Sequence, residues 1–231
     1  MFSRSTALLG KESMTLLQSK RVILFGIGGV GSWCAECLIR TGLKHLTIVD
    51  GDTVQASNLN RQLPATQATL GMPKVEALKA RLLEINPEAE IEAIYTMYNV
   101  QSTKEGPFDL SQYDYVIDAI DDVQAKTDLI LYATRARVRI FSSMGAALRF
   151  DPTQVTTGEL MAIKGDALAK AVRARMKKLD MRPFRKVKCV YSTEQAQQCE
   201  TRGSLMQVTA VFGCTLASMV IEDIRKGVAN A

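Results

Sequence analysis

The chain alternates between short, almost uninterrupted apolar runs and longer segments in which apolar positions recur at helical spacing. Continuous apolar runs bounded by turn residues are typical of strands buried on both faces of a sheet. Five such runs stand in the first two thirds of the chain: 21–27, 45–50, 89–96, 113–121 and 139–145. Segments with one apolar face predict helices at 5–19, 32–42, 72–87, 125–138 and 207–226.

Strands and helices that alternate in this way predict an α/β fold, Rossmann-like, with a doubly wound and mostly parallel sheet. The alternation fails from about residue 150, where a basic segment, a polar stretch and a long apolar helix follow one another. We therefore expect an irregular C-terminal extension. The whole chain, 1–231, is interpreted as a single domain with a nucleotide-binding core at 1–150 and an appended part at 151–231.

Glycines follow the first predicted strand in the order Gly26-x-Gly28-x-x-Gly31, and Asp50 ends the second strand. The first glycine permits a tight turn, the second lets the backbone approach phosphates, and the third lets the helix pack closely. An acid at the end of the next strand can accept hydrogen bonds from ribose. This pattern predicts a nucleotide site without specifying the nucleotide. Glycines required only for packing are the structural alternative.

Polar residues after Asp50 distinguish between nucleotides. Asp52, Asn58, Arg61, Gln62 and Lys74 follow within the next connection. Two cations at this edge suit a triphosphate, whose extra negative charge needs neutralising. A nicotinamide cofactor would leave them without a role, so the sequence favours ATP, although no Walker-type loop is present.

Asp118 and Asp121 end the fourth predicted strand at the same edge of the sheet. A carboxylate there can hold Mg2+, which bridges phosphate oxygens. We assign the metal to Asp121. For Asp118, a structural role as a strand-end acid that orients a neighbour is an equal alternative to contact with the metal or the nucleotide.

Composition adds the expected location. The chain is 47 % apolar with a mean hydropathy of +0.01, and we see no run of about 18 uncharged apolar residues of the kind that spans a membrane. The N-terminus lacks the apolar core of a secretory signal. The five cysteines form no regular framework, so reduced thiols in the cytoplasm are expected.

The basic segment 164–188 holds ten lysine or arginine residues against two aspartates, in a chain whose net charge is +5. Such a segment can dock on a polyanion, of which nucleic acid is the first candidate. A solvated helix face is the alternative.

The motifs GIGGVGSW, DGDTVQASNLNRQ, GMPKVEAL, INPE and VIDAIDD resemble, in order and spacing, the adenylation domain of ubiquitin-activating-enzyme-like proteins, the ThiF/MoeB-type adenylyltransferases. This resemblance covers about residues 1–150. SRSTALLG, FDPTQVTTGEL and KCVYSTE extend it, so that the chain resembles the tRNA threonylcarbamoyladenosine dehydratases along most of its length, less closely at 195–206. Those enzymes use ATP to cyclise threonylcarbamoyladenosine in tRNA.

The resemblance implies roles for matching positions. Gly28 and Gly29 would line the phosphates, Asp50 would bind ribose, and Asp121 would hold Mg2+. Asn58, Arg61 and Lys74 would hold the triphosphate. Arg4 matches an arginine that the partner subunit of a homodimer contributes to the phosphates; a mobile terminal charge is the alternative.

The same resemblance gives the basic segment tRNA as its partner. The residues expected to follow the tRNA backbone are Lys170, Arg173, Arg175, Lys177, Lys178 and Arg185. The part 151–231 is then the substrate-facing and dimerisation part. A sulfur-transfer protein is left open as a further partner.

The implied chemistry is transfer of AMP to the threonine carboxylate, followed by ring closure with AMP as the leaving group. Positioning and charge neutralisation dominate such chemistry. Cys199, in a polar loop, is the candidate for a transient thioester, although a bystander role is favoured for it and for Cys189, which we expect on a buried strand.

The second candidate function is adenylation of the C-terminal glycine of a ubiquitin-like sulfur carrier, which would use the same ATP residues. Enzymes of that type commonly carry two Cys-x-x-Cys pairs that hold zinc. This chain has one such pair, Cys34 and Cys37, whose helical spacing favours core filling, so the sulfur-carrier interpretation is weakened.

Overall fold

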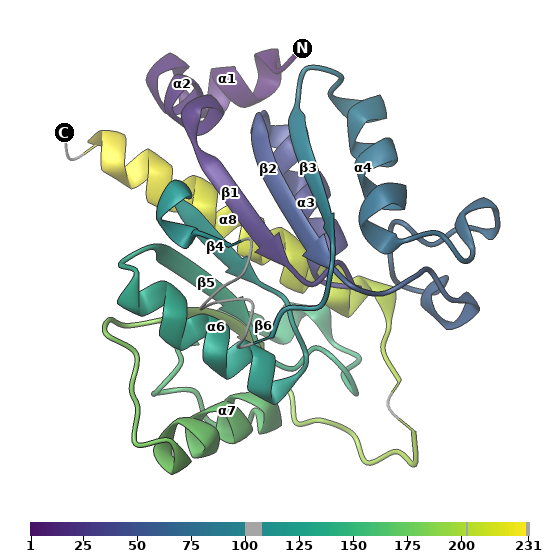
Figure 1. Ribbon diagram of the computed structural model, residues 1–231, viewed down its shortest axis with the longest axis vertical. Coiled ribbons are helices and arrows are strands. Elements are labelled where there is room, and N and C mark those ends of the chain that lie inside the picture. Colours follow the sequence, from purple (N-terminus) through teal and green to yellow (C-terminus); the bar gives the residue numbers. More distant parts are fainter. Residues whose placement is uncertain (100–107, 202, 230–231) are drawn as a thin grey trace.

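The computed structural model describes residues 1–99, 108–201 and 203–229. Its described strands form one sheet in the order β3-β2-β1-β4-β5-β7-β6 (Figure 1). The strands are β1 Arg21–Phe25, β2 His45–Asp50, β3 Glu90–Tyr95, β4 Tyr115–Asp118, β5 Arg139–Ser143, β6 Val155–Glu159 and β7 Lys188–Ser192. All neighbours pair in parallel except β6, which is antiparallel to β7. The five predicted strands and the doubly wound α/β class are confirmed.

Helices cover both faces of the sheet. Their bounds are α1 Ser3–Leu9, α2 Lys11–Ser19, α3 Gly31–Thr41, α4 Lys74–Ile85, α6 Val123–Arg135, α7 Ala167–Lys178 and α8 Met206–Ala229. One hydrophobic core lies between the sheet and helices α2, α3, α4 and α8. The other lies on the opposite face beneath α6 and α7.

The N-terminal segment departs from the single helix expected at 5–19. It forms two helices, because Gly10 separates them with φ 82° and ψ 157°. Both helices precede the first residue of β1, so they lie at the end of the sheet opposite the glycine loop (Figure 1).

The C-terminal part is more regular than expected. β6 and β7 extend the parallel sheet at its β5 edge, and Cys189 is buried on β7 as predicted. The basic segment contains α7, which is capped by Asp166, whose carboxylate accepts a hydrogen bond from Ala169 N. Of the extension, the described part of 193–205 remains outside helices and strands.

Helix α8 is long enough and apolar enough to cross a membrane, because an 18-residue stretch of it has a mean hydropathy of 1.3. Half of that stretch is buried inside the protein. Its buried residues, among them Phe212, Leu216 and Val220, belong to the core against α3. A core helix of this kind meets the same criteria, so its composition by itself indicates no membrane location.

Candidate functional site

The strand order reverses between β1 and β4, and the carboxyl ends of these two strands form the position at which open α/β sheets bind ligands. Gly26 follows β1 there with φ 89°. A Cβ at Gly26 would lie 2.7 Å from the carbonyl oxygen of Ala119, which follows β4. Gly31 begins α3 and packs so closely that a Cβ would overlap the Gly26 carbonyl oxygen. The loop from Gly26 to Gly31 therefore depends on glycine for its close packing.

Gly28 and Gly29 differ from those two glycines. The nearest atom to a Cβ on Gly28 is Gln62 Nε2 at 3.8 Å. A Cβ on Gly29 would lie 3.2 Å from Arg61 Cγ and 3.3 Å from Thr209 Cβ. The backbone at Gly28 is therefore open to a ligand, with Gln62 and Arg61 beside the loop.

Asp50 supports this loop from the end of β2. One carboxylate oxygen accepts a hydrogen bond from Ile27 N at 2.6 Å and the other from Asp52 N at 2.8 Å. Burial raises the pKa of Asp50 above its usual value, although Lys74 and these backbone hydrogen bonds oppose the shift. The carboxylate thus fixes the loop, and its placement at the strand end also suits the predicted ribose contact.

Residues 51–73 form an excursion that folds back on itself before α4. Val54 N donates to Met72 O at 2.8 Å, and Gly71 N donates to Val54 O at 2.9 Å. Trp33, on α3, donates from its indole nitrogen to Arg61 O at 3.2 Å. The excursion therefore brings residues far along the chain back to the start of α3.

Four predicted nucleotide-binding residues come from this excursion, of which Asp52 pairs with Lys74 and the other three lie near the glycine loop. Asn58 is buried and accepts a hydrogen bond from Gln55 N through Oδ1. Arg61 is half-buried and donates from Nη1 to Ser57 O and Asn60 Oδ1, both at 2.8 Å. Gln62 is 8 % exposed, and its Oε1 has no hydrogen-bond partner in the described part of the chain. An orphaned buried amide beside the open Gly28 indicates a place for a ligand.

Lys74 begins α4 and brings a buried cation to the same edge. Its ammonium group pairs with Asp52 Oδ2 at 2.7 Å, while its own backbone nitrogen donates to Asp52 O. The Lys74 side chain is 7 % exposed and that of Asp52 is 52 % exposed. Asp52 therefore holds Lys74 in place beside Asp50.

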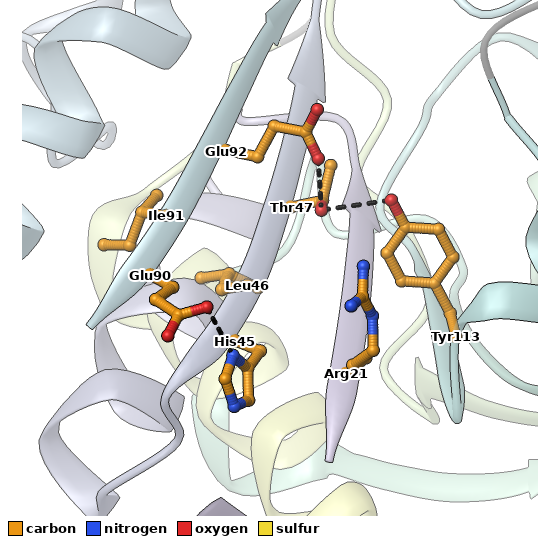
Figure 2. Close-up of a pocket in the computed structure, with 8 residues that line it drawn as sticks. All are labelled: Arg21, His45, Leu46, Thr47, Glu90, Ile91, Glu92 and Tyr113. Carbon is orange, nitrogen blue, oxygen red and sulfur yellow. Dashed lines mark hydrogen bonds and ion pairs between the residues drawn. The ribbon is translucent and has the colours of Figure 1, made fainter. Parts of the chain in front are cut away.

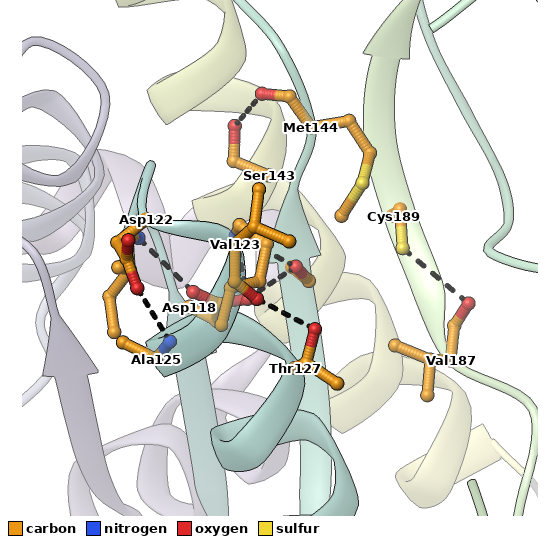
Figure 3. A network of polar contacts seen from close by, with 12 residues as sticks. Asp118, Asp122, Val123, Ala125, Thr127, Ser143, Met144, Val187 and Cys189 are labelled. Atoms are coloured by element: carbon orange, nitrogen blue, oxygen red, sulfur yellow. Dashed lines mark hydrogen bonds and ion pairs between the residues drawn. The ribbon is translucent and has the colours of Figure 1, made fainter. Parts of the chain in front are cut away.

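Asp118 takes a structural position at the end of β4 (Figure 3). It is fully buried and forms an ion pair of 2.7 Å with Lys126 of α6, which is fully buried as well. Ser142 of β5 donates to the same carboxylate oxygen at 2.5 Å, and Ile120 N donates to the other. Direct contact with a ligand would require this buried pair to open, so the geometry fits the orienting alternative better than contact with metal or nucleotide.

Asp121 and Asp122 lie in the connection from β4 to α6. Asp121 is exposed, and Asp122 caps α6 by accepting a hydrogen bond from Ala125 N at 2.7 Å (Figure 3). The same connection contacts the glycine loop through Ala119. The described residues contain no group of three or more His, Cys, Asp or Glu side chains that could hold a metal by themselves. A single exposed carboxylate suits Mg2+ that takes its other ligands from phosphates and water.

The arrangement fits a nucleotide triphosphate. It offers an open backbone at Gly28, an unpaired amide oxygen on Gln62, and the cations of Arg61 and Lys74 on one edge. Lys126 contributes by holding Asp118, a role that the sequence analysis missed. Asp118 ends β4 and Lys126 lies eight residues later on α6, so no helical spacing relates them and no local pattern marked the pair.

Arg149 is a second buried cation that the sequence analysis missed. It follows β5 and donates from Nε to Gly145 O at 3.0 Å and from Nη2 to Asp166 Oδ2 at 3.3 Å. Its Nη1 has no hydrogen-bond partner among the described residues. Only the folded chain brings Arg149 and Asp166 together, and no local motif marks either residue.

The connection from β7 to α8 passes this region. Gln197 N donates to Leu148 O, and Leu148 N donates to Gly203 O. Ser204 O accepts a hydrogen bond from Asn60, next to Arg61. Cys199 is exposed within this connection.

A separate concave site lies at the amino ends of β1, β2 and β3 (Figure 2). Arg21, His45 and Glu90 are the first residues of their strands, and Thr47 lies within hydrogen-bonding distance of both Glu92 and Tyr113. This concave site therefore lies at the opposite end of the strands from the glycine loop, and the predicted nucleotide-binding residues do not line it.

Two other groups of predicted residues lie away from the glycine loop. Arg4 is exposed on α1, at the far end of the sheet. Of the predicted tRNA-binding residues, Arg173 donates to Leu160 O and Arg175 contacts Asp128 at 3.5 Å. The exposed members of that set are Lys170, Lys177, Lys178 and Arg185.

Comparison with known proteins assigns the chain to a family. A model of the ThiF family matches residues 2–227. The chain belongs to the ThiF family. The resemblance inferred from its motifs is therefore confirmed.

Within the ThiF family, the similarity to dehydratases extends over almost the whole chain. The tRNA threonylcarbamoyladenosine dehydratase of Bacillus subtilis is 39 % identical over 229 residues, which are 99 % of this chain and 80 % of that protein. The crystal structure of Escherichia coli tRNA N6-threonylcarbamoyladenosine dehydratase, TcdA, in complex with ATP matches with a TM-score of 0.92 and 32 % identity. That match covers 99 % of this chain and 95 % of that chain.

ThiF-family adenylyltransferases of the sulfur-carrier type match less of the chain. The molybdopterin-synthase adenylyltransferase of Haemophilus influenzae is 34 % identical over 135 residues, which are 58 % of this chain and 54 % of that protein. The dehydratase therefore matches a much larger share of this chain than this adenylyltransferase does, and the sulfur-carrier alternative is not favoured.

Proposed function

We propose that this protein is an ATP-dependent dehydratase that cyclises threonylcarbamoyladenosine in tRNA. The observation that carries this conclusion is the similarity to tRNA threonylcarbamoyladenosine dehydratases over nearly the full chain, including the part in which the sulfur-carrier enzymes do not match. A nicotinamide oxidoreductase is the weaker choice, because it gives the buried Lys74 and the neighbouring Arg61 no task.

ATP would lie across the carboxyl ends of β1 and β4. The open backbone at Gly28, the neighbouring Gly29 and the start of α3 suit the phosphates, because a helix N-terminus presents free N–H groups. Arg61 and Lys74 would neutralise the phosphate charge, and Asn58 and Gln62 would supply neutral hydrogen bonds. Gly26, Gly31, Asp50 and Asp52 would hold the loop and the Lys74 side chain, as they do in this structure.

Mg2+ would be bound by Asp121, which is exposed in the connection whose Ala119 lies against Gly26. Mg2+ held there would supply positive charge that neutralises the phosphates. Asp118 would support the site without touching the nucleotide or the metal, because its ion pair with Lys126 fixes the end of β4 and the start of α6.

The reaction follows from the chemistry of the threonine carboxylate, which is a poor electrophile because its leaving group would be oxide. Attack of a carboxylate oxygen on the α-phosphorus of ATP releases pyrophosphate and gives an acyl adenylate. An internal nucleophile of the modified base then attacks the acyl carbon, and AMP leaves with that oxygen. The net change in the nucleoside is the loss of one water. Preorganised cations are the main contribution that the protein can make to both steps.

The tRNA would bind along the basic segment 164–188. Lys170, Lys177, Lys178 and Arg185 are exposed and suit contacts to the phosphate backbone, whereas Arg173 and Arg175 already contact the protein. In this proposal the core 1–150 binds the nucleotide, and 151–231 faces the tRNA and contributes to dimerisation. Cys199 remains the candidate for a transient thioester, because it is the exposed cysteine in the β7–α8 connection.

We further propose a homodimer in which Arg4 of one protomer completes the site of the other. Arg4 lies at the amino ends of the strands, whereas the glycine loop lies at their carboxyl ends, so Arg4 is far from the site of its own chain. A cytoplasmic location suits a tRNA substrate and reduced thiols. A sulfur-transfer protein is a further partner that the proposal allows without requiring.

The test is mass spectrometry of nucleosides from tRNA that carries threonylcarbamoyladenosine, after incubation with the protein, ATP and Mg2+. We expect the mass of that nucleoside to fall by one water, with release of AMP and pyrophosphate. The Arg61→Ala variant is the control, and it should leave the nucleoside unchanged. An unchanged mass with the intact protein, together with ATP–pyrophosphate exchange on a small carrier protein that ends in Gly-Gly, would overturn the proposal.

A further inference from the structure

Helices α3 and α8 pack in close contact on one face of the sheet. A Cβ at Gly213 of α8 would lie 2.4 Å from Val30 O and 2.7 Å from Trp33 Cβ, so the two helix backbones nearly touch. The residue after Gly213 is Cys214, and its Sγ lies 3.3 Å from Sγ of Cys37 on α3. The contact between the helices thus brings together two thiols that are 177 residues apart in the chain.

The two thiols differ in their surroundings. Cys214 is exposed and Cys37 is half-buried, while Cys34, one turn earlier on α3, is fully buried. Cys37 donates a hydrogen bond to Cys214, which lowers the pKa of Cys214 to about 7. That hydrogen bond and burial raise the pKa of Cys37, and burial raises the pKa of Cys34. A solvent-accessible thiol whose pKa is lowered by its neighbour therefore lies against a second thiol whose pKa is raised.

A metal does not explain this pair. Among the described residues, no third His, Cys, Asp or Glu joins them in a group that could hold an ion. Disulfide chemistry suits two neighbouring thiols of which one is a thiolate, because a thiolate whose pKa lies near the ambient pH is the most effective attacking group.

We propose that Cys37 and Cys214 are a dithiol modification site that closes to an intrachain disulfide when the protein meets a small-molecule disulfide such as oxidised glutathione. The Cys214 thiolate attacks one sulfur of the small disulfide, and the other half leaves as a thiolate. Cys37 then loses its proton to solvent and attacks Cys214 Sγ, and the second small thiolate leaves. The protein is oxidised by two electrons, and one small disulfide becomes two thiols.

The closure needs little movement. A disulfide bond is about 2.05 Å long, so the two sulfurs must approach by roughly 1.3 Å. Rotation of the exposed Cys214 side chain can supply much of this. Cys34 is excluded from the first step by its complete burial.

The bond would join the two elements that meet at the glycine loop. Helix α3 begins at that loop, and Thr209, in the first turn of α8, lies against Gly29. A cross-link between residues so distant in sequence restricts the unfolded chain strongly. We therefore expect the oxidised protein to unfold at a temperature roughly 5 °C or more higher than the reduced protein.

The test uses the full folded chain with oxidised glutathione at neutral pH, followed by alkylation of the remaining thiols in denaturant and peptide mapping by mass spectrometry. We expect one linked peptide pair that joins Cys37 and Cys214 of the same chain and is two hydrogens lighter than the separate peptides. Cys34 and Cys189 should be alkylated. The Cys199→Ser variant should give the same linked pair, because Cys199 takes no part.

The Cys37→Ser variant is the matched control, and in it Cys214 should keep a stable glutathione adduct. If that variant fails to fold, the peptide map of the unchanged chain tests the proposal by itself. A stable glutathione adduct on Cys214 of the unchanged chain would overturn the proposal. So would a bond that joins two copies of the chain, a bond from Cys34, or closure that occurs only in denaturant.

Discussion

At the scale of single residues, the glycine loop separates structural from ligand-facing positions. Gly26 has φ 89° and lies against the Ala119 carbonyl, whereas the space beside Gly28 is open up to Gln62. The motif assigns the tight turn to Gly26 and the approach to phosphates to Gly28, and the surroundings of the two glycines differ in the way that these roles require. Because their surroundings differ, substitutions at Gly26 and Gly28 can separate the structural role of the loop from its role in binding a ligand.

Gly26→Ala and Gly28→Ala should therefore fail in different ways. We expect Gly26→Ala to lower the free energy of unfolding by roughly 2–5 kcal/mol, because it combines a strained backbone with an atomic overlap. Gly28→Ala should leave stability almost unchanged and weaken ATP binding, because its methyl group occupies the approach to the phosphates. Denaturant unfolding and calorimetric titration with ATP check the pair. Equal loss of stability in both variants would contradict this assignment.

At the scale of elements, a buried carboxylate connects the loop helix to its neighbour. Glu36 of α3 accepts hydrogen bonds from Arg81 of α4 at 2.6 Å and from Arg40 at 2.8 Å. Burial by itself would raise the pKa of Glu36, but these two guanidinium groups outweigh burial and hold the pKa below its usual value. Since Lys74 begins α4, the connection also fixes the base of the nucleotide site.

Glu36→Gln should reduce the free energy of unfolding at pH 7 by about 1–3 kcal/mol, the usual contribution of a charged hydrogen bond. The folded-state pKa is lowered, so the contribution of Glu36 is complete above the unfolded pKa of about 4.3 and is lost as the pH falls through the folded value. Urea unfolding of both proteins at pH 7 and near pH 3 measures this. A difference that persists undiminished at the acid pH would show that charge is not its cause.

Helix α7 carries the second prediction at this scale. Lys177 is exposed on α7, while Lys79 lies on α4, outside the basic segment. We expect Lys177→Glu to weaken tRNA binding and to reduce the slope of log Kd against log salt by about 1, because one phosphate contact is lost. Lys79→Glu is the matched control and should change neither quantity. ATP affinity should be equal in both variants, and an unchanged salt slope for Lys177→Glu would exclude α7 from the tRNA surface.

At the scale of the whole molecule, the proposed site needs a second chain. α1 and the glycine loop lie at opposite ends of β1, so the predicted contact of Arg4 with phosphates can occur only between protomers (Figure 1). The partner would then supply a third cation beside Arg61 and Lys74. Two inactive variants, one changed at Arg4 and one at Arg61, could therefore complement one another in a mixed dimer, which a site built from one chain would not allow.

Arg4→Ala and Arg61→Ala should each be inactive and should complement one another. A dimer with one copy of each variant has one site with both arginines intact. Random mixing after subunit exchange should restore roughly a quarter of the activity of the unchanged protein. The nucleoside mass assay measures this recovery. If activity stays at the level of the separate variants while mixed dimers are present, Arg4 does not act across the interface.

The sequence by itself determined the elements whose causes are local. Apolar runs gave the five predicted strands and the parallel core, and glycine spacing placed the loop before α3. The order of motifs identified the family and hence the function that we propose. Even so, one local signal was misread at Gly10, where two helices replace the single helix expected.

The tertiary structure alone decided the contacts between distant residues. Asp118 became a buried partner of Lys126, Arg149 met Asp166, and β6 and β7 joined the sheet edge. Cys37 packs against the core, as its spacing predicted, but only the tertiary structure also brings it against Cys214 on α8. The physical reason is that periodicity records which face of an element is buried. It does not record which element covers that face, and only packing of the complete chain decides this.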